Sequence, residues 1–162
     1  MNNIQVAIMM GSESDALVMS EAAKLLKEFS VTCEMRVLSA HRTPKQVVQY
    51  VEARVKTGTQ IFICGAGGSA ALAGVVAAHT RVVVIGVPID SMGLGGLDAL
   101  LSTVQMPPGV PVAGVAIGKP GARNAALLAV RILALSDKAL LKKLERYHQT
   151  QVQKILKIKV GI

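Results

Sequence analysis

The sequence predicts an α/β protein, a three-layer sandwich whose central parallel sheet has about five strands with helices on both faces. Short apolar runs alternate with amphipathic stretches of helical length, and parallel strands need such crossovers to connect them. Hydrophobic residues make up 51% of the 162 residues but aromatic ones only 2%, so small aliphatic side chains must form the core. The length suits one domain, and so apolar a composition excludes intrinsic disorder.

The first half of the chain alternates strand and helix. Residues 4–10 are an apolar run that ends at Gly11, as expected of a strand buried on both faces. Residues 16–29 follow with apolar residues at helical spacing. We then expect a strand at 31–38, a helix at 44–56 that begins at Pro44, and a strand at 60–64.

The second half continues this order and closes with two consecutive helices. We expect a helix at 69–79, a strand at 82–87, a helix at 97–104, a strand at 112–117, and helices at 123–135 and 138–157. Residues 1–162 are then a single domain, with a core at 1–136 and a C-terminal helical extension at 137–162. Such alternation is typical of flavodoxin-like and Rossmann-like sheets.

The last predicted helix has an apolar stripe without an obvious partner. Leu141, Leu144, Val152 and Ile155 lie on it at helical spacing, although the helix before it already completes the sandwich. We therefore expect this C-terminal helix to pack on a neighbouring subunit.

The net charge of +8 lies entirely in the last part of the chain. Residues 1–118 carry eight charges of each sign, whereas ten Lys and Arg in residues 119–162 face only Asp137 and Glu145. A nucleic-acid-binding face would need stacking aromatic residues or a reading helix, and only Tyr147 is present there. We favour a solvated or subunit-facing helix, with a nucleotide- or nucleic-acid-binding module as the alternative.

Cysteine content and hydropathy narrow the cellular setting. Cys33 and Cys64 are too few for a disulfide scaffold, and no secretory leader opens the sequence. The longest uncharged stretches, 57–80 and 99–118, are broken by glycines and prolines respectively, so neither suits a membrane span. We expect a cytoplasmic protein that does not insert into a membrane.

Serines and an aspartate follow the first predicted strand. In open α/β sheets ligands bind beyond the carboxyl ends of the strands, where this segment should lie. Ser12 and Ser14 could donate hydroxyl hydrogen bonds to a phosphate at the helix start, while the alternative is that they cap the helix and Asp15 complements its dipole. Arg42, after the second strand, favours the phosphate interpretation because a guanidinium binds phosphate through two parallel hydrogen bonds.

His41 is the best catalytic candidate. Its ordinary pKa near neutrality suits both the gain and the loss of a proton, and it shares its loop with Ser39 and Arg42. His79 and His148 fit structural roles better. No cluster of His, Cys or carboxylates has metal-ligand spacing, so we expect no metal site.

The glycine-rich segment after the third strand has two interpretations. Residues 65–70 formally match the Gly-x-Gly-x-x-Gly/Ala dinucleotide fingerprint, which keeps a nicotinamide-dependent oxidoreductase open. The fingerprint belongs to the first strand-helix turn, however, and an acid should end the next strand. We prefer a flat floor on which a planar ring lies against backbone, with N–H groups of Gly67, Gly68 and Ser69 able to hold a developing anion.

Four loop motifs together resemble one enzyme family. The motifs are Gly11-Ser12-Glu13-Ser14-Asp15, Ser39-Ala40-His41-Arg42-Thr43-Pro44, Gly65-Ala66-Gly67-Gly68, and Leu100-Leu101-Ser102-Thr103-Val104-Gln105-Met106-Pro107. With these motifs the chain resembles, in order and spacing over nearly its whole length, the catalytic subunit of phosphoribosylaminoimidazole carboxylase, whose bacterial form is N5-carboxyaminoimidazole ribonucleotide mutase. Residues 118–129 also match, with Pro120 in place of an alanine.

The resemblance implies a step of de novo purine biosynthesis. A carboxylate would move from the exocyclic nitrogen of an aminoimidazole ribonucleotide to ring carbon C4 through carbon dioxide, without ATP, metal or other cofactor. It also implies a homo-octamer with sites at subunit contacts. By this resemblance Ser12 and Arg42 would bind the phosphate, Asp15 the ribose hydroxyls, and His41 would be the proton shuttle.

One segment departs from the family pattern. Many members have His-Leu-Pro-Gly where this chain has Ala71-Leu72-Ala73-Gly74, so a second active-site histidine is absent. Direct carboxylation of aminoimidazole ribonucleotide by carbon dioxide is therefore an alternative. Arg42 favours the mutase, because the direct carboxylases tend to have lysine at that position.

Overall fold

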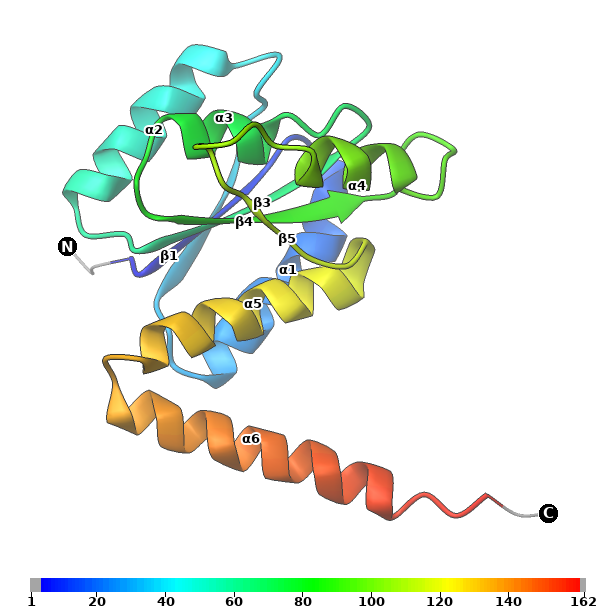
Figure 1. The fold of residues 1–162 in the computed structure, drawn as a ribbon. Helices are drawn as coiled ribbons and strands as arrows, with labels where there is room; N and C mark the ends of the chain where they lie inside the picture. Colours follow the sequence, from blue (N-terminus) through cyan, green and yellow to red (C-terminus); the bar gives the residue numbers. More distant parts are fainter. Residues whose placement is uncertain (1–3, 161–162) are drawn as a thin grey trace.

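The computed structural model describes residues 4–160, which form the predicted alternation of strands and helices (Figure 1). A short 3-10 turn, Glu13–Asp15, precedes the first helix. The strands are β1 Val6–Met10, β2 Cys33–Val37, β3 Ile61–Gly67, β4 Val83–Ile89 and β5 Ala113–Gly114. The helices are α1 Ala16–Glu28, α2 Pro44–Lys56, α3 Leu72–Ala78, α4 Leu97–Val104, α5 Gly118–Ala134 and α6 Lys138–Leu156.

The five strands form one sheet in the order β2-β1-β3-β4-β5, and every pair is parallel. This is the flavodoxin-like order, so the predicted fold class is confirmed. The chain leaves β1 toward β2 on one side and later returns to β3 on the other. The loops after β1 and β3 therefore diverge at the carboxyl edge of the sheet, which opens a crevice there.

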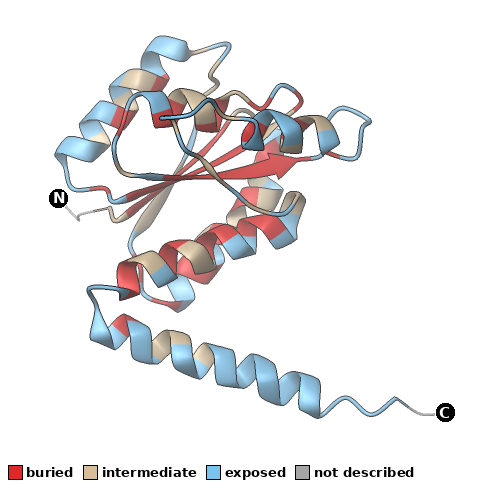
Figure 2. Ribbon diagram, in the orientation of Figure 1, coloured by how far each residue is buried: buried red, intermediate tan, exposed pale blue. Residues whose placement is uncertain are grey.

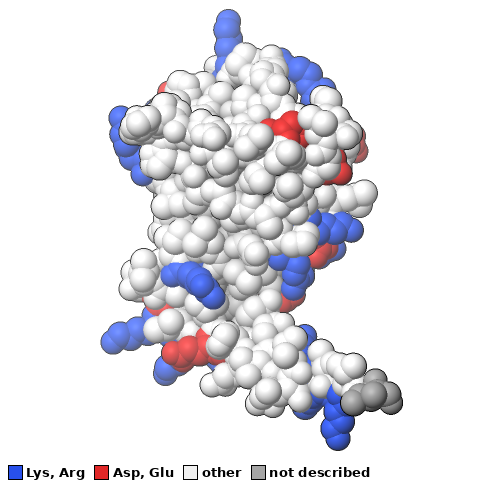
Figure 3. All heavy atoms as spheres, turned by 45° about the vertical axis from the view of Figure 1, so that its right-hand side comes forward, with Lys and Arg blue, Asp and Glu red and all other residues white. Residues whose placement is uncertain are grey.

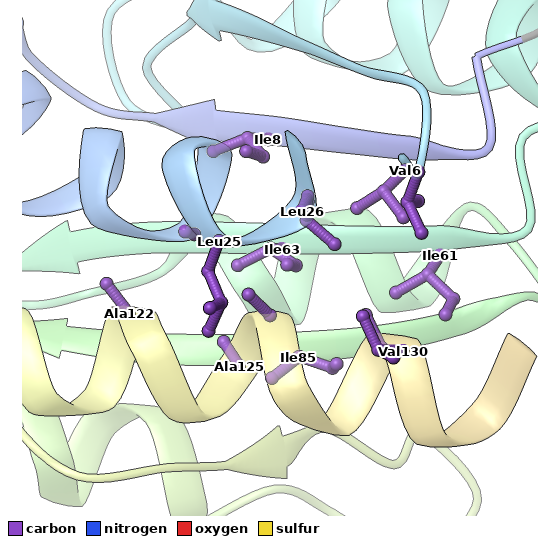
Figure 4. Packing of buried hydrophobic residues seen from close by; sticks show 14 of the residues in the cluster. Val6, Ile8, Leu25, Leu26, Ile61, Ile63, Ile85, Ala122, Ala125 and Val130 are labelled. Carbon is purple, nitrogen blue, oxygen red and sulfur yellow. The ribbon is translucent and has the colours of Figure 1, made fainter. Parts of the chain in front are cut away.

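Alternate residues of the central strands face two separate hydrophobic layers. In β1, Val6 and Ile8 pack with α1 and α5, whereas Ala7 and Met9 pack with α2 and α3. Figure 4 shows the first layer, in which Leu25 of α1 and alanines of α5 lie against isoleucines of the sheet. All four of these β1 residues are fully buried, as predicted for a strand covered on both faces.

Glycine in the sheet allows one helix to approach closely. A Cβ at Gly86 of β4 would overlap the methyl group of Thr103 and lie 3.0 Å from Val112. Thr103 in turn donates a hydrogen bond of 2.7 Å from its hydroxyl to the carbonyl oxygen of Ala99. The missing side chain thus sets the distance between β4 and α4.

Element ends differ from the sequence prediction at β3. This strand continues to Gly67 rather than ending at 64, because residues 65–67 pair with Val87–Ile89 of β4. The next helix then begins at Leu72 rather than at 69. Positive φ angles at Gly68 (60°) and Ala70 (22°) keep the intervening turn out of the helical conformation.

The last strand and the helix after it also differ from prediction. Strand β5 has two residues instead of the expected six at 112–117, because only Ala113 and Gly114 pair with β4, opposite Ile85 and Gly86. Helix α5 begins at Gly118 rather than at 123, with Pro120 in its first turn, where its missing N–H costs nothing. A Cβ at Gly121 would overlap the carbonyl of Ala116, so glycine permits this tight entry.

Helix α6 leaves the body of the molecule (Figures 1 and 2). Its first half is anchored, since Leu140 is buried and the rings of Tyr147 and Phe29 lie 5.4 Å apart. The Lys143 ammonium donates to the Phe29 carbonyl oxygen at 3.1 Å and so caps the end of α1. The second half is exposed, and Ile155 is 69% accessible. No helix within residues 4–160 is both long and apolar enough to cross a membrane.

Candidate functional site

A pocket of about 420 Å³ opens at the carboxyl edge of the sheet, at the crevice that the strand order creates. The loops after β1, β2, β3 and β4 all contribute to it. The lining residues are Gly11, Ser12, Ser14, Asp15, Ser39, Ala40, His41, Arg42, Ala66, Gly67, Ala70, Ala71, Leu72, Ser91 and Met92. Segments far apart in the sequence thus share one hollow.

The loop after β1 supplies two hydroxyls and a buried carboxylate. Ser14 Oγ donates to Ser12 Oγ at 3.0 Å, and the Ser12 N–H donates to Asp15 Oδ2 at 3.1 Å. Asp15 is 5% exposed, and this burial raises the pKa of its carboxyl. The N–H groups of Ser12 and Gly11 and the charge of Arg42 oppose that rise. Asp15 therefore has a capping role as well, because its carboxylate accepts a hydrogen bond from the Ser12 N–H at the start of the helix.

Arg42 ties the second loop to the first. Its Nη2 donates to the Gly11 carbonyl oxygen at 2.6 Å, and its Nε lies 3.4 Å from Ser39 Oγ. The backbone N–H of Arg42 also donates to Ser39 Oγ, at 3.2 Å. The guanidinium is exposed and adjoins the serines of the first loop in the pocket lining. This wall therefore presents a fixed positive charge beside hydroxyl groups, which suits an anionic ligand.

His41 is presented by a compact turn. The Ser39 N–H donates to Thr43 Oγ1 at 2.9 Å, and the Thr43 N–H donates to the Ser39 carbonyl oxygen at 2.9 Å. These bonds close the loop around His41, which is exposed and lines the pocket. Within residues 4–160 its imidazole makes no hydrogen bond, so both ring nitrogens are available to a ligand.

The opposite wall comes from the loops after β3 and β4 and is largely apolar. Gly67 lies at the end of β3, where a Cβ would overlap the Ser91 hydroxyl. Gly68 is covered by Met92, whose Cγ would be 3.2 Å from a Cβ at that glycine. Gly68 and the exposed Ser69, which the sequence also singles out, do not line this pocket. The chain turns away after Gly67.

The structure brings together most of the residues that the sequence singles out. Seven of them line the pocket, namely Ser12, Ser14, Asp15, Ser39, His41, Arg42 and Gly67. Ser91 and Met92 also line the pocket, although neither is among the predicted site residues. Their signal was the polar loop after the fourth strand, but that strand runs two residues further than predicted, to Ile89, and so delivers Ser91 to the pocket edge.

The other candidates lie elsewhere. His79 follows α3 and His148 is on α6, and neither lines this pocket. No group of three or more His, Cys, Asp or Glu residues in the described chain could hold a metal ion. The formal dinucleotide fingerprint lacks its usual geometry, because Gly65 and Gly67 are strand residues paired with β4 rather than parts of a turn into a helix.

Basic residues do not form a continuous strip on the face shown in Figure 3, where Lys and Arg side chains are separated by uncharged surface. In α6, Lys143 is engaged with the end of α1. The predicted nucleic-acid-binding alternative therefore gains no support from this face.

Comparison with known proteins shows which family this chain is similar to. The family model for AIR carboxylase matches residues 5–154. Proteins named N5-carboxyaminoimidazole ribonucleotide mutase are 53% identical in Pyrococcus abyssi (90% of this chain, 82% of the relative) and 47% identical in Escherichia coli (96% and 92%). The crystal structure of Treponema denticola PurE is similar with a TM-score of 0.86 and 34% identity, covering 93% of each chain.

Proposed function

The chain belongs to the AIR carboxylase family, and from this premise we propose that it converts N5-carboxyaminoimidazole ribonucleotide to 4-carboxyaminoimidazole ribonucleotide in de novo purine biosynthesis. It would then be an isomerase of the mutase type. The observation that carries the proposal is the single pocket in which a guanidinium, a buried carboxylate, serine hydroxyls and an imidazole converge.

The polar wall suits the ribose phosphate. Arg42 supplies a fixed positive charge, and Ser12 and Ser14 supply hydroxyl donors for the phosphate oxygens. Asp15 presents a carboxylate that accepts hydrogen bonds, as the ribose hydroxyls require. Ser39 holds Arg42 in place through its hydroxyl. The nucleotide end would therefore lie against the loops after β1 and β2.

The base would lie toward Gly67 and the apolar wall, beside His41. The bond between the exocyclic nitrogen and the carboxyl carbon breaks, which leaves carbon dioxide and a nitrogen that takes a proton from His41. Ring carbon C4 then attacks the carbon dioxide and forms the new carbon–carbon bond. His41 removes the C4 proton, which restores aromaticity and regenerates the acid.

The reaction also requires that the pocket confine carbon dioxide. Carbon dioxide must stay next to C4 until that carbon attacks it. The apolar wall would favour this because it limits the escape and rotation of the carbon dioxide. Ala66, Ala70 and Leu72 provide apolar surface there, and the backbone N–H group of Gly67 would stabilise the developing carboxylate.

The functional assembly would be a cytoplasmic homo-octamer, as the family resemblance implies. Helix α4 supports an oligomer because it exposes large apolar side chains that a neighbouring subunit could cover. Leu97, Leu101 and Val104 are 54%, 48% and 46% accessible. The exposed second half of α6 fits the predicted contact with a neighbouring subunit. Both cysteines are unpaired, as is usual in a reducing compartment. Light scattering should give a particle eight times the 17.0 kDa chain mass.

The activity test uses two substrates. Purified protein at low bicarbonate should convert N5-carboxyaminoimidazole ribonucleotide and leave aminoimidazole ribonucleotide unchanged. Conversion of the second nucleotide, driven by added carbon dioxide, with the first left untouched, would instead establish direct carboxylation. Turnover of neither, by protein that is folded and assembled, would refute both activities.

A further inference from the structure

Ser91 is the single polar side chain on the apolar wall of the pocket. The other polar side chains of the lining come from the loops after β1 and β2, whereas the wall from β3 and β4 otherwise consists of glycine, alanine, leucine and methionine. Within residues 4–160 the Ser91 hydroxyl makes no hydrogen bond. A hydroxyl that is accessible and unpaired in a pocket is free to bind a ligand.

Packing, rather than hydrogen bonding, sets the position of this hydroxyl. Ile89 of β4 pairs with Gly67 of β3, and Ser91 follows two residues later. A Cβ at Gly67 would overlap Ser91 Oγ and would lie 2.9 Å from the Ile89 carbonyl oxygen. The hydroxyl therefore occupies the space that any side chain at Gly67 would take.

The neighbouring residue strengthens this placement. The Met92 side chain covers Gly68, with its Cγ 3.2 Å and its Cε 3.3 Å from the Cβ position of that glycine. Two consecutive loop residues are thus seated on two consecutive glycines at the end of β3. Beyond them, Gly93 has nothing within 4 Å of its Cβ position, so the close contact ends there.

We propose that Ser91 contacts the substrate and donates a hydrogen bond to its carboxylate, so that it distinguishes carboxylated from uncarboxylated aminoimidazole ribonucleotides. This rests on the proposed function, which lays the ring against Gly67. The hydroxyl would lie beside Gly67, whose backbone N–H group we assign to the same carboxylate. Aminoimidazole ribonucleotide has no negatively charged acceptor at this position, so the hydrogen bond from Ser91 would favour the carboxylated nucleotide.

Calorimetric titration of Ser91→Ala with both nucleotides tests the proposal. Affinity for 4-carboxyaminoimidazole ribonucleotide should fall about tenfold or more, the usual effect of losing a hydrogen bond to a charged group. Affinity for aminoimidazole ribonucleotide should stay within about twofold of the wild-type value. Ser91→Cys, which keeps the side-chain shape but donates weakly, should show the same selective loss. Ser136→Ala, between α5 and α6 and outside the pocket, is the matched control.

The outcomes separate this inference from the activity itself. Wild-type protein that binds neither nucleotide would refute the proposed function. Wild-type protein that binds both, with Ser91→Ala unchanged or weakened equally toward both, would overturn only the role of Ser91. Selective loss of the carboxylated ligand in both Ser91 variants, with unchanged melting temperatures, would establish it.

Discussion

The Nη2 atom of Arg42 donates a hydrogen bond of 2.6 Å to the carbonyl oxygen of Gly11 and so joins the loop after β2 to the loop after β1. This contact fixes a positive charge beside Ser12 without neutralising it, because a carbonyl oxygen carries no net charge. The remaining guanidinium N–H groups stay available for a ligand.

We expect Arg42→Ala to weaken nucleotide binding by at least about tenfold, because a phosphate would lose a charged partner. Arg42→Lys keeps the charge but lacks the planar fork, so it should recover only part of the affinity. Titration calorimetry measures both variants. Lys45→Ala, which removes a nearby charge outside the pocket, is the control. Wild-type affinity in Arg42→Ala would move the phosphate to another part of the pocket.

His41→Asn should bind the ribonucleotide normally but lose turnover by about 10²–10⁴-fold, the usual contribution of a general acid–base. The side chain lies on a hydrogen-bonded turn that does not depend on the imidazole, so the fold should persist. Steady-state kinetics and a binding titration on the same preparation separate the two effects. His79→Asn should keep the wild-type rate, and a near-normal rate in His41→Asn would exclude the proton-shuttle mechanism.

The buried Asp15 carboxyl makes the free energy of unfolding depend on pH. Burial raises the pKa of its carboxyl above the ordinary value of 3.8, so the folded protein holds this proton more tightly than the unfolded chain does. The proton on Asp15 therefore adds to the free energy of unfolding, and this contribution is fully present below pH 3.8, the ordinary pKa. It is lost as the pH rises through the higher pKa of the folded protein. Asp15→Asn has no charge to bury there, so it should be more stable than the wild type at pH 7.

Urea unfolding at several pH values checks this expectation. The stability advantage of Asp15→Asn should shrink as the pH falls through the raised folded-state pKa of Asp15, because the wild-type carboxyl then takes up its proton. Asp90→Asn, an exposed position outside the pocket, is the matched control for the substitution itself. An advantage that instead grows on acidification would mean that the folded protein favours the charged form of Asp15.

Gly86→Ala should destabilise the fold by about 1–3 kcal/mol, because the new methyl group would overlap Thr103 and force β4 and α4 apart. Adding Thr103→Ser removes the opposing methyl group but keeps the hydroxyl that bonds to Ala99. The double variant should regain part of the loss in chemical denaturation. If Thr103→Ser leaves the cost of Gly86→Ala unchanged, the contact with Thr103 does not limit the approach of α4.

Local sequence pattern was enough to predict the order of elements and the polar wall of the site. The apolar run at 4–10 and the spacing in 16–29 depend on residues close in sequence, and a strand at Val6–Met10 and a helix at Ala16–Glu28 form there. Ser12, His41 and Arg42 could be assigned to one edge because the carboxyl ends of parallel strands lie together. None of this required knowledge of which side chains touch.

Pairing between distant segments decided the apolar wall. Whether the chain continues as a strand after Cys64 depends on the partner strand, and the pairing of Gly67 with Ile89 lengthens β3 and β4 together. That pairing moves Gly68 and Ser69 out of the pocket and brings Ser91 in. Such ladders are non-local, because backbone hydrogen bonds between strands carry almost no trace in the sequence of either strand. The order of the elements is written in local periodicity, whereas the limits of the strands, and with them half of the pocket, follow from contacts that form only in the folded chain.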